Sequence, residues 1–380
     1  MIYLDNSASS YKKPKCVKKM VKTSLNILTA NPGRSGHKAS QKIGNLVYET
    51  REIIKQFFVA PDYNVIFTKN CSEALNLAIV GTLKNGDHVI TTCYEHNSVL
   101  RTLESLKIKG VETTILECNL ADFHKEFKDH IKPNTKLVIT TLVSNVTGEK
   151  CKISQVGKVC RNCNITYLVD GAQGVGHVPI NMEEMNVDML TFSGHKGLLS
   201  LTGVGGLVVA NFLKLNPIMF GGTGTESENL TQPTQIPEGF EVGTLPTISI
   251  VSLFAGIRFL LKNFNKTQKK EEKLSKYLYF SLKKLEFVKI YSNINSVNVF
   301  AFNVKGVDSM LVANELNNKN ICVRSGLHCA PLIHKKLGTS STGAVRVSVD
   351  FNNSKRDINK LVGALKFVNK KLSKLADDRE

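Results

Sequence analysis

Short apolar runs alternate with amphipathic stretches from about residue 63 to residue 210. Seven runs have the length and β-branched composition of strands: NVIFT, HVITT, TTILE, KLVITTLV, TYLVD, DMLTFS and VGGLVV. Helical spacing of apolar residues lies between several of them, in SEALNLAIVGTLK, NSVLRTLESLKIKG and ISQVGKVCRNC. This alternation predicts an α/β domain built on a mainly parallel, seven-stranded sheet. The active site of such a sheet lies beyond the carboxyl ends of its strands, so residues that directly follow a strand are candidates for function.

The pattern changes after residue 220. Residues 221–246, GGTGTESENLTQPTQIPEGFEVGTLP, are rich in glycine, threonine and proline and predict a long loop, which in a compact domain is usually functional or disordered. A long helix is predicted over 247–264, followed by a lysine-rich helix over 266–285. Strand-like runs then occur at 296–304 and 344–351, and helical stretches at 307–318 and 355–375. Together they predict a smaller α+β domain. We therefore expect a large domain over 13–246 and a small domain made of 247–380 together with 1–12.

Nine cysteines occur at irregular spacing, and the first ten residues, MIYLDNSASS, lack the basic and apolar regions of a signal peptide. We therefore expect a reducing, cytoplasmic location and no disulfide framework. Cys160 and Cys163 have the spacing of half a zinc or redox site, but no second half follows, so we interpret them as structural and expect no metal. No apolar run approaches the roughly 20 residues of a membrane span, so no membrane partner is expected.

Lysine and arginine outnumber acidic residues by 50 to 32, which gives a net charge of +18. A charge of this size can mark a nucleic-acid-binding surface. The lysines are spread along helix-like segments, however, and no DNA- or RNA-binding motif accompanies them. We therefore interpret them as a solvated surface, expect no nucleic-acid partner, and expect anionic small molecules or acidic proteins to be attracted.

Polar residues directly follow the first two predicted strands. NVIFT leads to Asn70, Cys71 and Ser72 at the start of a helix. Free N–H groups and a hydroxyl at that position can bind an anion such as phosphate, although an ordinary helix cap gives the same pattern. HVITT leads to Glu95 and His96, where a single histidine is more often structural than catalytic.

Two later strands end at residues with more specific chemistry. TYLVD ends at Asp170, which could pair with a protonated ring nitrogen, although aspartate before glycine is also common in turns. DMLTFS ends at Ser193 and is followed by His195 and Lys196, with glycines on both sides. A lysine held away from bulk water has a lowered pKa and suits Schiff-base chemistry, and Ser193 and His195 could hold a phosphate beside it. A lysine, an acid, an aromatic histidine and a phosphate site together match the needs of pyridoxal phosphate.

With these residues in place, the chain resembles the class V aminotransferase family of fold-type I pyridoxal-phosphate enzymes, and within it the cysteine desulfurases and selenocysteine lyases. The motifs run along nearly the whole chain: YLDNSASS, NPGRSGH, TKNCSEALNL, YEHNSVL, LVSNVTGE, LVDGAQGVGH, TFSGHKG, FEVGT, RSGLHCAPL and VRVSVDFNN. The resemblance implies pyridoxal phosphate as cofactor and L-cysteine or L-selenocysteine as substrate. It also implies a sulfur-acceptor protein as partner and a homodimer with shared active sites.

The resemblance assigns the cofactor to residues of the large domain. Lys196 would form the Schiff base, Asp170 would pair with the pyridinium nitrogen, and Gln173 would bind the phenolic oxygen. His96 would stack on the ring and move protons. The phosphate would be held, partly through backbone amides, by Cys71, Ser72, Ser193 and His195. Thr244, in FEVGT, would reach the phosphate of the neighbouring subunit.

The substrate is assigned to a different set of residues. Arg346 would clamp the substrate carboxylate with Arg324 close to it, since a planar guanidinium suits bidentate binding. Asn145 would lie near the substrate and the ring oxygen. Arg34 and His37 in the N-terminal loop are further matches to the family.

Cys329 indicates the reaction. Group II desulfurases carry their nucleophilic cysteine on a short loop with an Arg-x-Gly-His-His-Cys-Ala pattern, and RSGLHCA, whose cysteine stands 17 positions before Arg346, fits that group. Leu327 stands where the first histidine is usual, which leaves His328 as the adjacent imidazole that could help to deprotonate the thiol. Cys71 likewise replaces a common threonine. The short loop predicts a poorly exposed thiol.

The resemblance therefore predicts a cysteine desulfurase that converts L-cysteine to L-alanine and leaves a persulfide on Cys329. A selenocysteine lyase would use the same residues. An aminotransferase, epimerase or kynureninase-type enzyme of the same family is a further alternative, in which Cys329 would be incidental.

Overall fold

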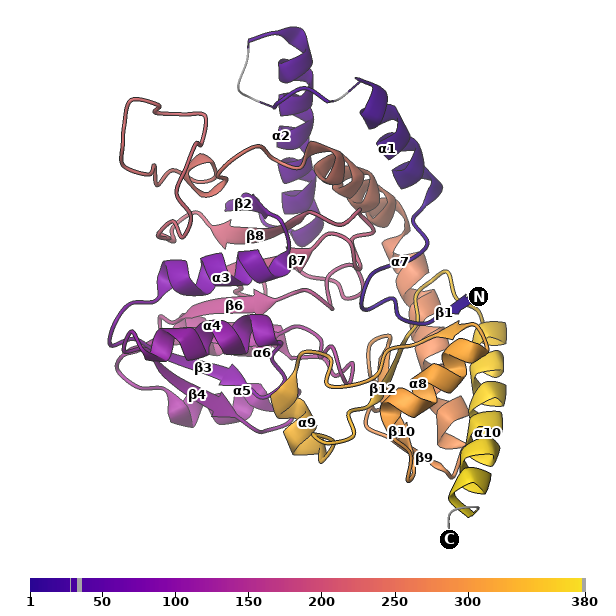
Figure 1. The fold of residues 1–380 in the computed structure, drawn as a ribbon. Helices are drawn as coiled ribbons and strands as arrows, with labels where there is room; N and C mark the ends of the chain where they lie inside the picture. Colours follow the sequence, from indigo (N-terminus) through magenta and orange to yellow (C-terminus); the bar gives the residue numbers. More distant parts are fainter. Residues whose placement is uncertain (28, 33–35, 378–380) are drawn as a thin grey trace. The chain divides into compact units, whose positions relative to one another are not determined.

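The computed structural model describes the chain except for residues 28, 33–35 and 378–380 (Figure 1). Packing divides the chain into two compact units. The large unit comprises residues 13–142 and 151–264, and the small unit comprises 1–12, 143–150 and 265–380. The small unit thus includes an internal segment, 143–150, that lies within the limits predicted for the large domain. Residues 247–264, assigned from the sequence to the small domain, belong to the large unit.

A seven-stranded sheet forms the centre of the large unit, in the order β2-β8-β7-β6-β5-β3-β4. All strands are parallel except β8, which runs antiparallel to both of its neighbours, β2 and β7. The strands are β2 (Tyr63–Thr68), β3 (His88–Thr92), β4 (Glu112–Leu116), β5 (Thr135–Thr141), β6 (Thr166–Asp170), β7 (Met189–Ser193) and β8 (Gly205–Ala210). Each apolar run identified in the sequence forms one of them, so the predicted α/β fold with a mainly parallel sheet is confirmed.

The large unit contains the helices α1 (Lys15–Ile27), α2 (Lys38–Phe58), α3 (Cys71–Thr82), α4 (Asn97–Lys107), α5 (Phe123–Glu126), the 3-10 turn η1 (Phe127–His130), α6 (Ile153–Asn162) and the 3-10 turn η2 (Glu238–Phe240). Among them, α2, α3, α4 and α6 contact strands of the sheet. Figure 1 shows α3 and α4 side by side across the sheet. Leu75 and Ile79 of α3 and Val99 and Leu103 of α4 are buried in one cluster with sheet residues such as Ile139.

Two smaller sheets lie in the small unit. An antiparallel sheet has the order β12-β10-β9, formed by β9 (Val288–Ile290), β10 (Val299–Val304) and β12 (Val345–Ser348). A parallel pair joins β1 (Ile2–Tyr3) to β11 (Ile321–Cys322). The helices are α8 (Ser309–Asn318), α9 (Pro331–Leu337) and α10 (Lys355–Asp377). Phe300 and Phe302 of β10 and Leu361 and Leu365 of α10 are fully buried in one core.

The helix α7 (Thr247–Lys283) is continuous over 37 residues, where the sequence predicted two helices. No glycine or proline separates the two predicted segments, so nothing breaks the helix between them. By length and apolar composition α7 reaches the range of a membrane-spanning helix, which the search for apolar runs did not predict. Half of its most apolar window is buried inside the structure, as in the core helices of globular proteins.

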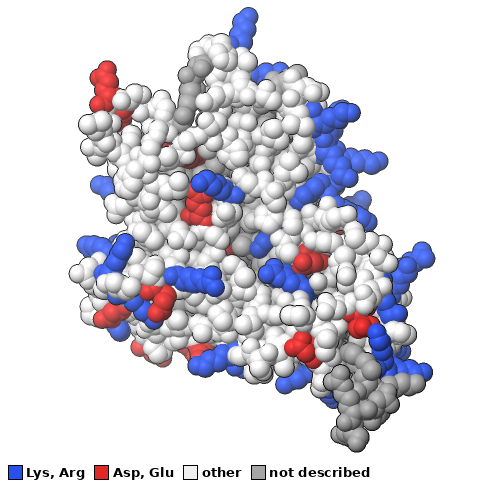
Figure 2. Space-filling model, viewed as in Figure 1, with Lys and Arg blue, Asp and Glu red and all other residues white. Residues whose placement is uncertain are grey.

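Basic side chains are dispersed over the surface. Figure 2 shows lysine and arginine scattered over the visible face, with fewer acidic side chains between them. On α1, Lys15, Lys18, Lys19 and Lys22 are all exposed. The helix keeps its buried side at Val17 and Ser24, so its basic residues point to solvent.

Candidate active site

Eight of the predicted cofactor residues lie in the large unit, at one edge of its sheet. Because β2 and β7 are both antiparallel to β8, they run in the same direction as each other and as β3 and β6. The residues that follow these four strands therefore meet at the carboxyl edge. They are Cys71 and Ser72 after β2, His96 after β3, Asp170 and Gln173 at and after β6, and Ser193, His195 and Lys196 at and after β7.

The start of α3 presents donor groups at this edge. The side chain of Asn70 caps the helix by accepting a hydrogen bond from the N–H of Glu73, at 3.0 Å. By helix geometry, the first-turn N–H groups of Cys71 and Ser72 have no acceptor within the helix. Ser72 is also exposed, so its hydroxyl and these N–H groups are accessible to an anion, and the phosphate site stays a prediction.

The side chain of Cys71 turns inward toward Asp170. Its sulfur lies 3.6 Å from Oδ1 of Asp170 and 3.4 Å from Oγ1 of Thr191. Burial, together with the negative charge of Asp170, raises the pKa of the Cys71 thiol well above its ordinary value. Cys71 is therefore a neutral hydrogen-bond donor to the buried carboxylate. The same carboxylate oxygen accepts the N–H of Ala172 at 2.9 Å.

His96 is held by the first turn of α4. Its Nδ1 accepts the backbone N–H of Ser98 at 3.0 Å, so the proton of the neutral ring lies on Nε2. The Ser98 hydroxyl lies 2.9 Å from the same Nδ1 and 2.6 Å from the hydroxyl of Ser72. One chain of hydrogen bonds thus links the predicted phosphate site to the predicted ring-stacking histidine.

Glu95 is a buried acid to which the sequence interpretation gave no role. Its Oε1 accepts hydrogen bonds from Oγ1 of Thr92 at 2.7 Å and from the N–H of Thr141 at 2.9 Å. Its Oε2 has no hydrogen-bond partner among the described residues. Burial, with a smaller contribution from the charge of Asp170, raises the pKa of Glu95 to about 8. The carboxyl is thus mostly protonated at neutral pH and joins the end of β3 to the end of β5. An acid in the short turn after the strand HVITT was the signal that could have identified it.

Close packing surrounds Lys196. A Cβ on Gly197 would collide with the carbonyl oxygen of Val175, and one on Gly194 would lie 2.6 Å from the Ser200 hydroxyl. Gly197 is therefore required for the turn after β7 to pack against the loop after β6, and Gly194 for that turn to fold against its own end. Nζ of Lys13 donates to the carbonyl oxygen of His195 at 3.0 Å.

His195, next to Lys196, is neutral. Burial, with the positive charges of Lys196 and Lys13, lowers the pKa of His195 to about 4. The imidazole can therefore offer a neutral N–H to an anion without adding charge to the site.

Thr244 lies apart from this group, exposed in the loop that precedes α7. That loop is anchored by Glu241, whose two carboxylate oxygens accept hydrogen bonds from Arg51 at 2.8 and 2.7 Å. Oε1 of Glu241 also accepts the N–H of Phe67, at 2.6 Å. The sequence interpretation missed this ion pair, which fixes the loop to β2. Arg34 lies outside the described residues, and His37 caps α2 by accepting the N–H of Ser40.

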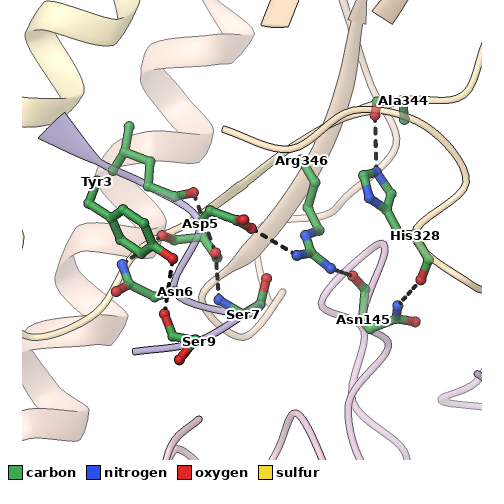
Figure 3. A network of polar contacts seen from close by, with 11 residues as sticks. Tyr3, Asp5, Asn6, Ser7, Ser9, Asn145, His328, Ala344 and Arg346 are labelled. Atoms are coloured by element: carbon green, nitrogen blue, oxygen red, sulfur yellow. Dashed lines mark hydrogen bonds and ion pairs between the residues drawn. The ribbon is translucent and has the colours of Figure 1, made fainter. Parts of the chain in front are cut away.

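The predicted substrate residues lie in the small unit, where they form one network (Figure 3). Arg346, on β12, is 1% exposed. Its NH2 donates to Oδ1 of Asp5 at 2.9 Å, and its NH1 donates to the carbonyl oxygen of Asn145 at 3.1 Å. Arg324 joins the backbone of Arg346 by two hydrogen bonds. The sequence interpretation did not identify Asp5, because its partner lies 341 positions away.

Asn145 joins this network to the cysteine loop. Its Nδ2 donates to the carbonyl oxygen of His328 at 2.6 Å. Oriented as in Figure 3, the side chain of Asn145 points to the loop while its backbone oxygen faces Arg346.

The loop itself is tightly held, but its thiol is exposed. His328 and Cys329 both have positive φ, 49° and 57°, which is a strained backbone for residues other than glycine. Cys329 is exposed, so the expectation of a poorly exposed thiol is wrong: the left-handed backbone turns this side chain outward while His328 turns inward. All nine cysteines carry free thiols.

His328 is not suited to deprotonate Cys329. Its ring is buried, with Nε2 3.0 Å from the carbonyl oxygen of Ala344. Burial and the charge of Arg346 lower the pKa of His328 to about 2, so the ring is neutral and its Nε2 is a donor. Arg346 is a cation that interacts with the thiol of Cys329. Burial lowers the pKa of Arg346, and the charges of Asp5 and Cys329 offset part of that lowering.

The chain is similar to known proteins along nearly its whole length. The sequence profile named Aminotransferase class-V matches residues 2–361. A probable cysteine desulfurase of Pyrococcus abyssi is 34% identical over 98% of this chain and 95% of its own. A cysteine desulfurase of Wigglesworthia glossinidia brevipalpis is 31% identical over 97% and 93%. The apo structure of a cysteine desulfurase from Thermococcus onnurineus is 33% identical, with a TM-score of 0.88 over 97% of this chain and 94% of that one.

Proposed function

Because the chain belongs to the class V aminotransferase family, we propose that it is a pyridoxal-phosphate-dependent cysteine desulfurase. The reaction converts L-cysteine to L-alanine and leaves the sulfur as a persulfide on Cys329. The observation that carries this proposal is the exposed thiol of Cys329, on a loop that Asn145 ties to the buried guanidinium of Arg346. An aminotransferase has no use for such a thiol, whereas sulfur transfer requires one.

The donor groups of the large unit fit pyridoxal phosphate. A primary amine between obligatory glycines, a buried carboxylate and a helix N-terminus bearing a hydroxyl are what the aldehyde, the ring nitrogen and the phosphate each require. When bound, the cofactor would withdraw electrons from the α-carbon of the amino acid. The residues that would hold it are Lys196, Asp170, His96, Gln173, Ser72, Ser193, His195 and the backbone of Cys71.

Each residue then has a defined task. Arg346 binds the substrate carboxylate, and Nζ of Lys196 removes the α-proton and returns it during formation of alanine. The thiolate of Cys329 attacks the sulfur of the substrate, so that an S–S bond forms as the Cβ–S bond breaks. The electron pair of the broken bond stays with the carbon skeleton, which is protonated to L-alanine. No external oxidant or reductant is needed, because one cysteine and one thiol give one alanine and one persulfide.

The same proposal has three further parts. The enzyme belongs to group II of the desulfurases, forms a homodimer and passes its sulfur to an acceptor protein. The RSGLHCA motif and the 17 positions between Cys329 and Arg346 support group II. Phe220 and Leu230, 75% and 103% exposed beside the loop that carries Thr244, support coverage by a second subunit. The exposed thiol of Cys329 supports transfer of sulfur to an acceptor protein.

The test is to incubate the purified protein with L-cysteine, L-selenocysteine or cysteine sulfinate. Alanine is measured, and the persulfide on Cys329 is located by mass spectrometry. Lys196→Ala should lose the Schiff-base absorbance. Cys329→Ser should keep that absorbance but release no sulfide, whereas Cys163→Ser, at another exposed thiol, should behave as wild type. Sulfide release at the wild-type rate by Cys329→Ser would refute the nucleophile, and a preference for selenocysteine would identify a selenocysteine lyase instead.

A further inference from the structure

The guanidinium of Arg346 is only partly used by the protein. Of its five N–H donors, one bonds Asp5 and one bonds the carbonyl oxygen of Asn145. Nε has no hydrogen-bond partner among the described residues, although the side chain is almost wholly buried. A buried donor without an acceptor is costly unless a ligand supplies one. The contacts with Asp5 and Asn145 thus fix the orientation of the guanidinium, and its remaining N–H groups can donate to a carboxylate.

The charges around Arg346 are also unbalanced. Arg324 and Arg346 are hydrogen-bonded neighbours along the backbone, and the positive charge of Arg324 contributes to lowering the pKa of Arg346. The ion pair with Asp5 supplies one negative charge. One positive charge is left over, which suits a single anionic group from outside. Asp5 therefore holds Arg346 in place without cancelling the charge that would attract the substrate.

Asp5 is itself held rigidly by backbone contacts. It pairs with Ser348 as a continuation of β1, and the N–H of Ser348 donates to the carbonyl oxygen of Leu4 at 2.7 Å. The N–H of Ser7 donates to Oγ of Ser348 at 2.8 Å, and Nδ2 of Asn6 donates to the carbonyl oxygen of Ser348 at 3.1 Å. The segment around Asp5 is thus attached to Ser348 of β12, two residues beyond Arg346.

We propose that Asp5 is a positioning residue for the substrate carboxylate: it fixes the Arg346 guanidinium so that its remaining donors face that carboxylate. The inference rests on the proposed function and adds the N-terminal segment to the substrate site. Asp5 acts through Arg346 and touches neither the substrate nor the cofactor. Its effect is therefore on binding of the amino acid, not on the chemical step.

The test uses the full-length enzyme with its cofactor and the substitution Asp5→Asn, which keeps the shape of the side chain and removes its charge. The ion pair with Arg346 becomes a weaker hydrogen bond to a neutral amide oxygen. KM for L-cysteine should therefore rise about tenfold, while kcat changes by less than about twofold. Glu286→Gln, at an exposed acid of the same unit, is the matched control and should leave both constants unchanged. In an Arg346→Ala background, Asp5→Asn should cause no further loss, because the residue it positions is gone.

Equilibrium binding of L-alanine gives a readout that needs no turnover. Asp5→Asn should weaken that binding by about the same factor as it raises KM. Unchanged alanine binding in a folded Asp5→Asn enzyme would overturn the inference, as would a fall in kcat at constant KM. A further loss on top of Arg346→Ala would likewise assign Asp5 a purely structural role. A wild type that binds L-alanine but forms none from L-cysteine would refute the proposed function instead, and the binding comparison would still decide the role of Asp5.

Discussion

The two groups of candidate residues are built in different ways. In the large unit, each residue follows a strand directly, so that Asp170 and Lys196 reach their place through local sequence and the common direction of the strands. In the small unit, Asp5, Asn145 and Arg346 come from segments that lie hundreds of positions apart. The first arrangement can be recognised in short motifs, whereas the second exists only after folding. Substitutions should therefore act locally in the large unit and propagate through the network in the small unit.

The largest effect is expected at the centre of that network. Arg346→Ala removes the proposed substrate clamp and leaves the partly buried Asp5 without its partner. We expect kcat/KM for L-cysteine to fall about a thousandfold, and the free energy of unfolding to fall by about 3 kcal/mol. Steady-state kinetics and urea unfolding measure the two effects. Arg346→Lys keeps the positive charge but loses the planar guanidinium with its paired N–H donors, so this variant should recover stability more than activity. Full activity in this variant would contradict bidentate binding of the carboxylate.

The second-largest difference is expected in the reactivity of cysteine thiols, between the buried cysteines of the large unit and Cys329 of the small unit. Cys71 and Cys151 are buried, and burial raises the pKa of Cys71 well above its ordinary value and that of Cys151 to about 12. Cys329 is exposed. Because the thiolate is the reactive form, iodoacetamide should modify Cys329 at least about a hundredfold faster than Cys71 or Cys151. Peptide mass spectrometry during a time course measures the rates, with labelling in urea as the reference for full access. Equal rates in the folded protein would contradict the buried position of Cys71.

A moderate effect is expected at Glu95. Burial raises the pKa of its carboxyl from 4.5 to about 8 in the folded chain. Between these values the folded chain keeps a proton that the unfolded chain has released, so stability falls as the pH rises from about 4.5 to about 8. The glutamine of Glu95→Gln is neutral at every pH, so this variant should escape the loss, which amounts to roughly 3–4 kcal/mol between pH 5 and pH 8.

Unfolding curves measured across that pH range test this expectation. Glu117→Gln, at an exposed acid of the same unit, is the control and should follow the wild type. Parallel pH profiles for the wild type and Glu95→Gln would show that Glu95 is ionised in the folded protein.

The smallest effect is expected at Leu327. This side chain is 38% exposed, and His328 beside it is buried and neutral. Leu327→His restores the usual residue of the motif on the surface, so alanine formation should change by less than about threefold. The rate is measured with and without a thiol acceptor for the sulfur. An increase of tenfold or more would show that an imidazole at position 327 activates Cys329.

The sequence predicted the features that depend on local patterns. All seven strands of the large sheet were recognised, because apolar runs such as HVITT and TYLVD are bounded by turn residues. The positions of Asp170, Ser193 and Lys196 at the sheet edge followed from the same strands. The ion pair of Arg51 with Glu241 could not be predicted, because its two residues lie 190 positions apart and each is ordinary in its own segment.

The cysteine loop shows a second limit. A short loop indicated a poorly exposed thiol, but exposure depends on the backbone at His328 and Cys329, and both have positive φ. Neither residue type favours that conformation, so only the surrounding contacts select it. His328 was expected to assist the thiol because it is adjacent in sequence. The same backbone turns the ring of His328 toward the carbonyl oxygen of Ala344, so the ring does not assist the thiol.

The attachment of β1 to β11 and β12 has a consequence for synthesis of the protein. Residues 2–7 bond to residues 320–353, so the small unit must close loops of more than 300 residues. Closing so long a loop is slow and entropically costly. On a ribosome, the sheet of the large unit can assemble once residue 210 has emerged, whereas the first residues must wait until β12 appears. Folding of the proposed substrate site should therefore be the last event. A stalled or truncated chain would present the folded sheet of the large unit without Arg346, the arginine proposed to bind the substrate.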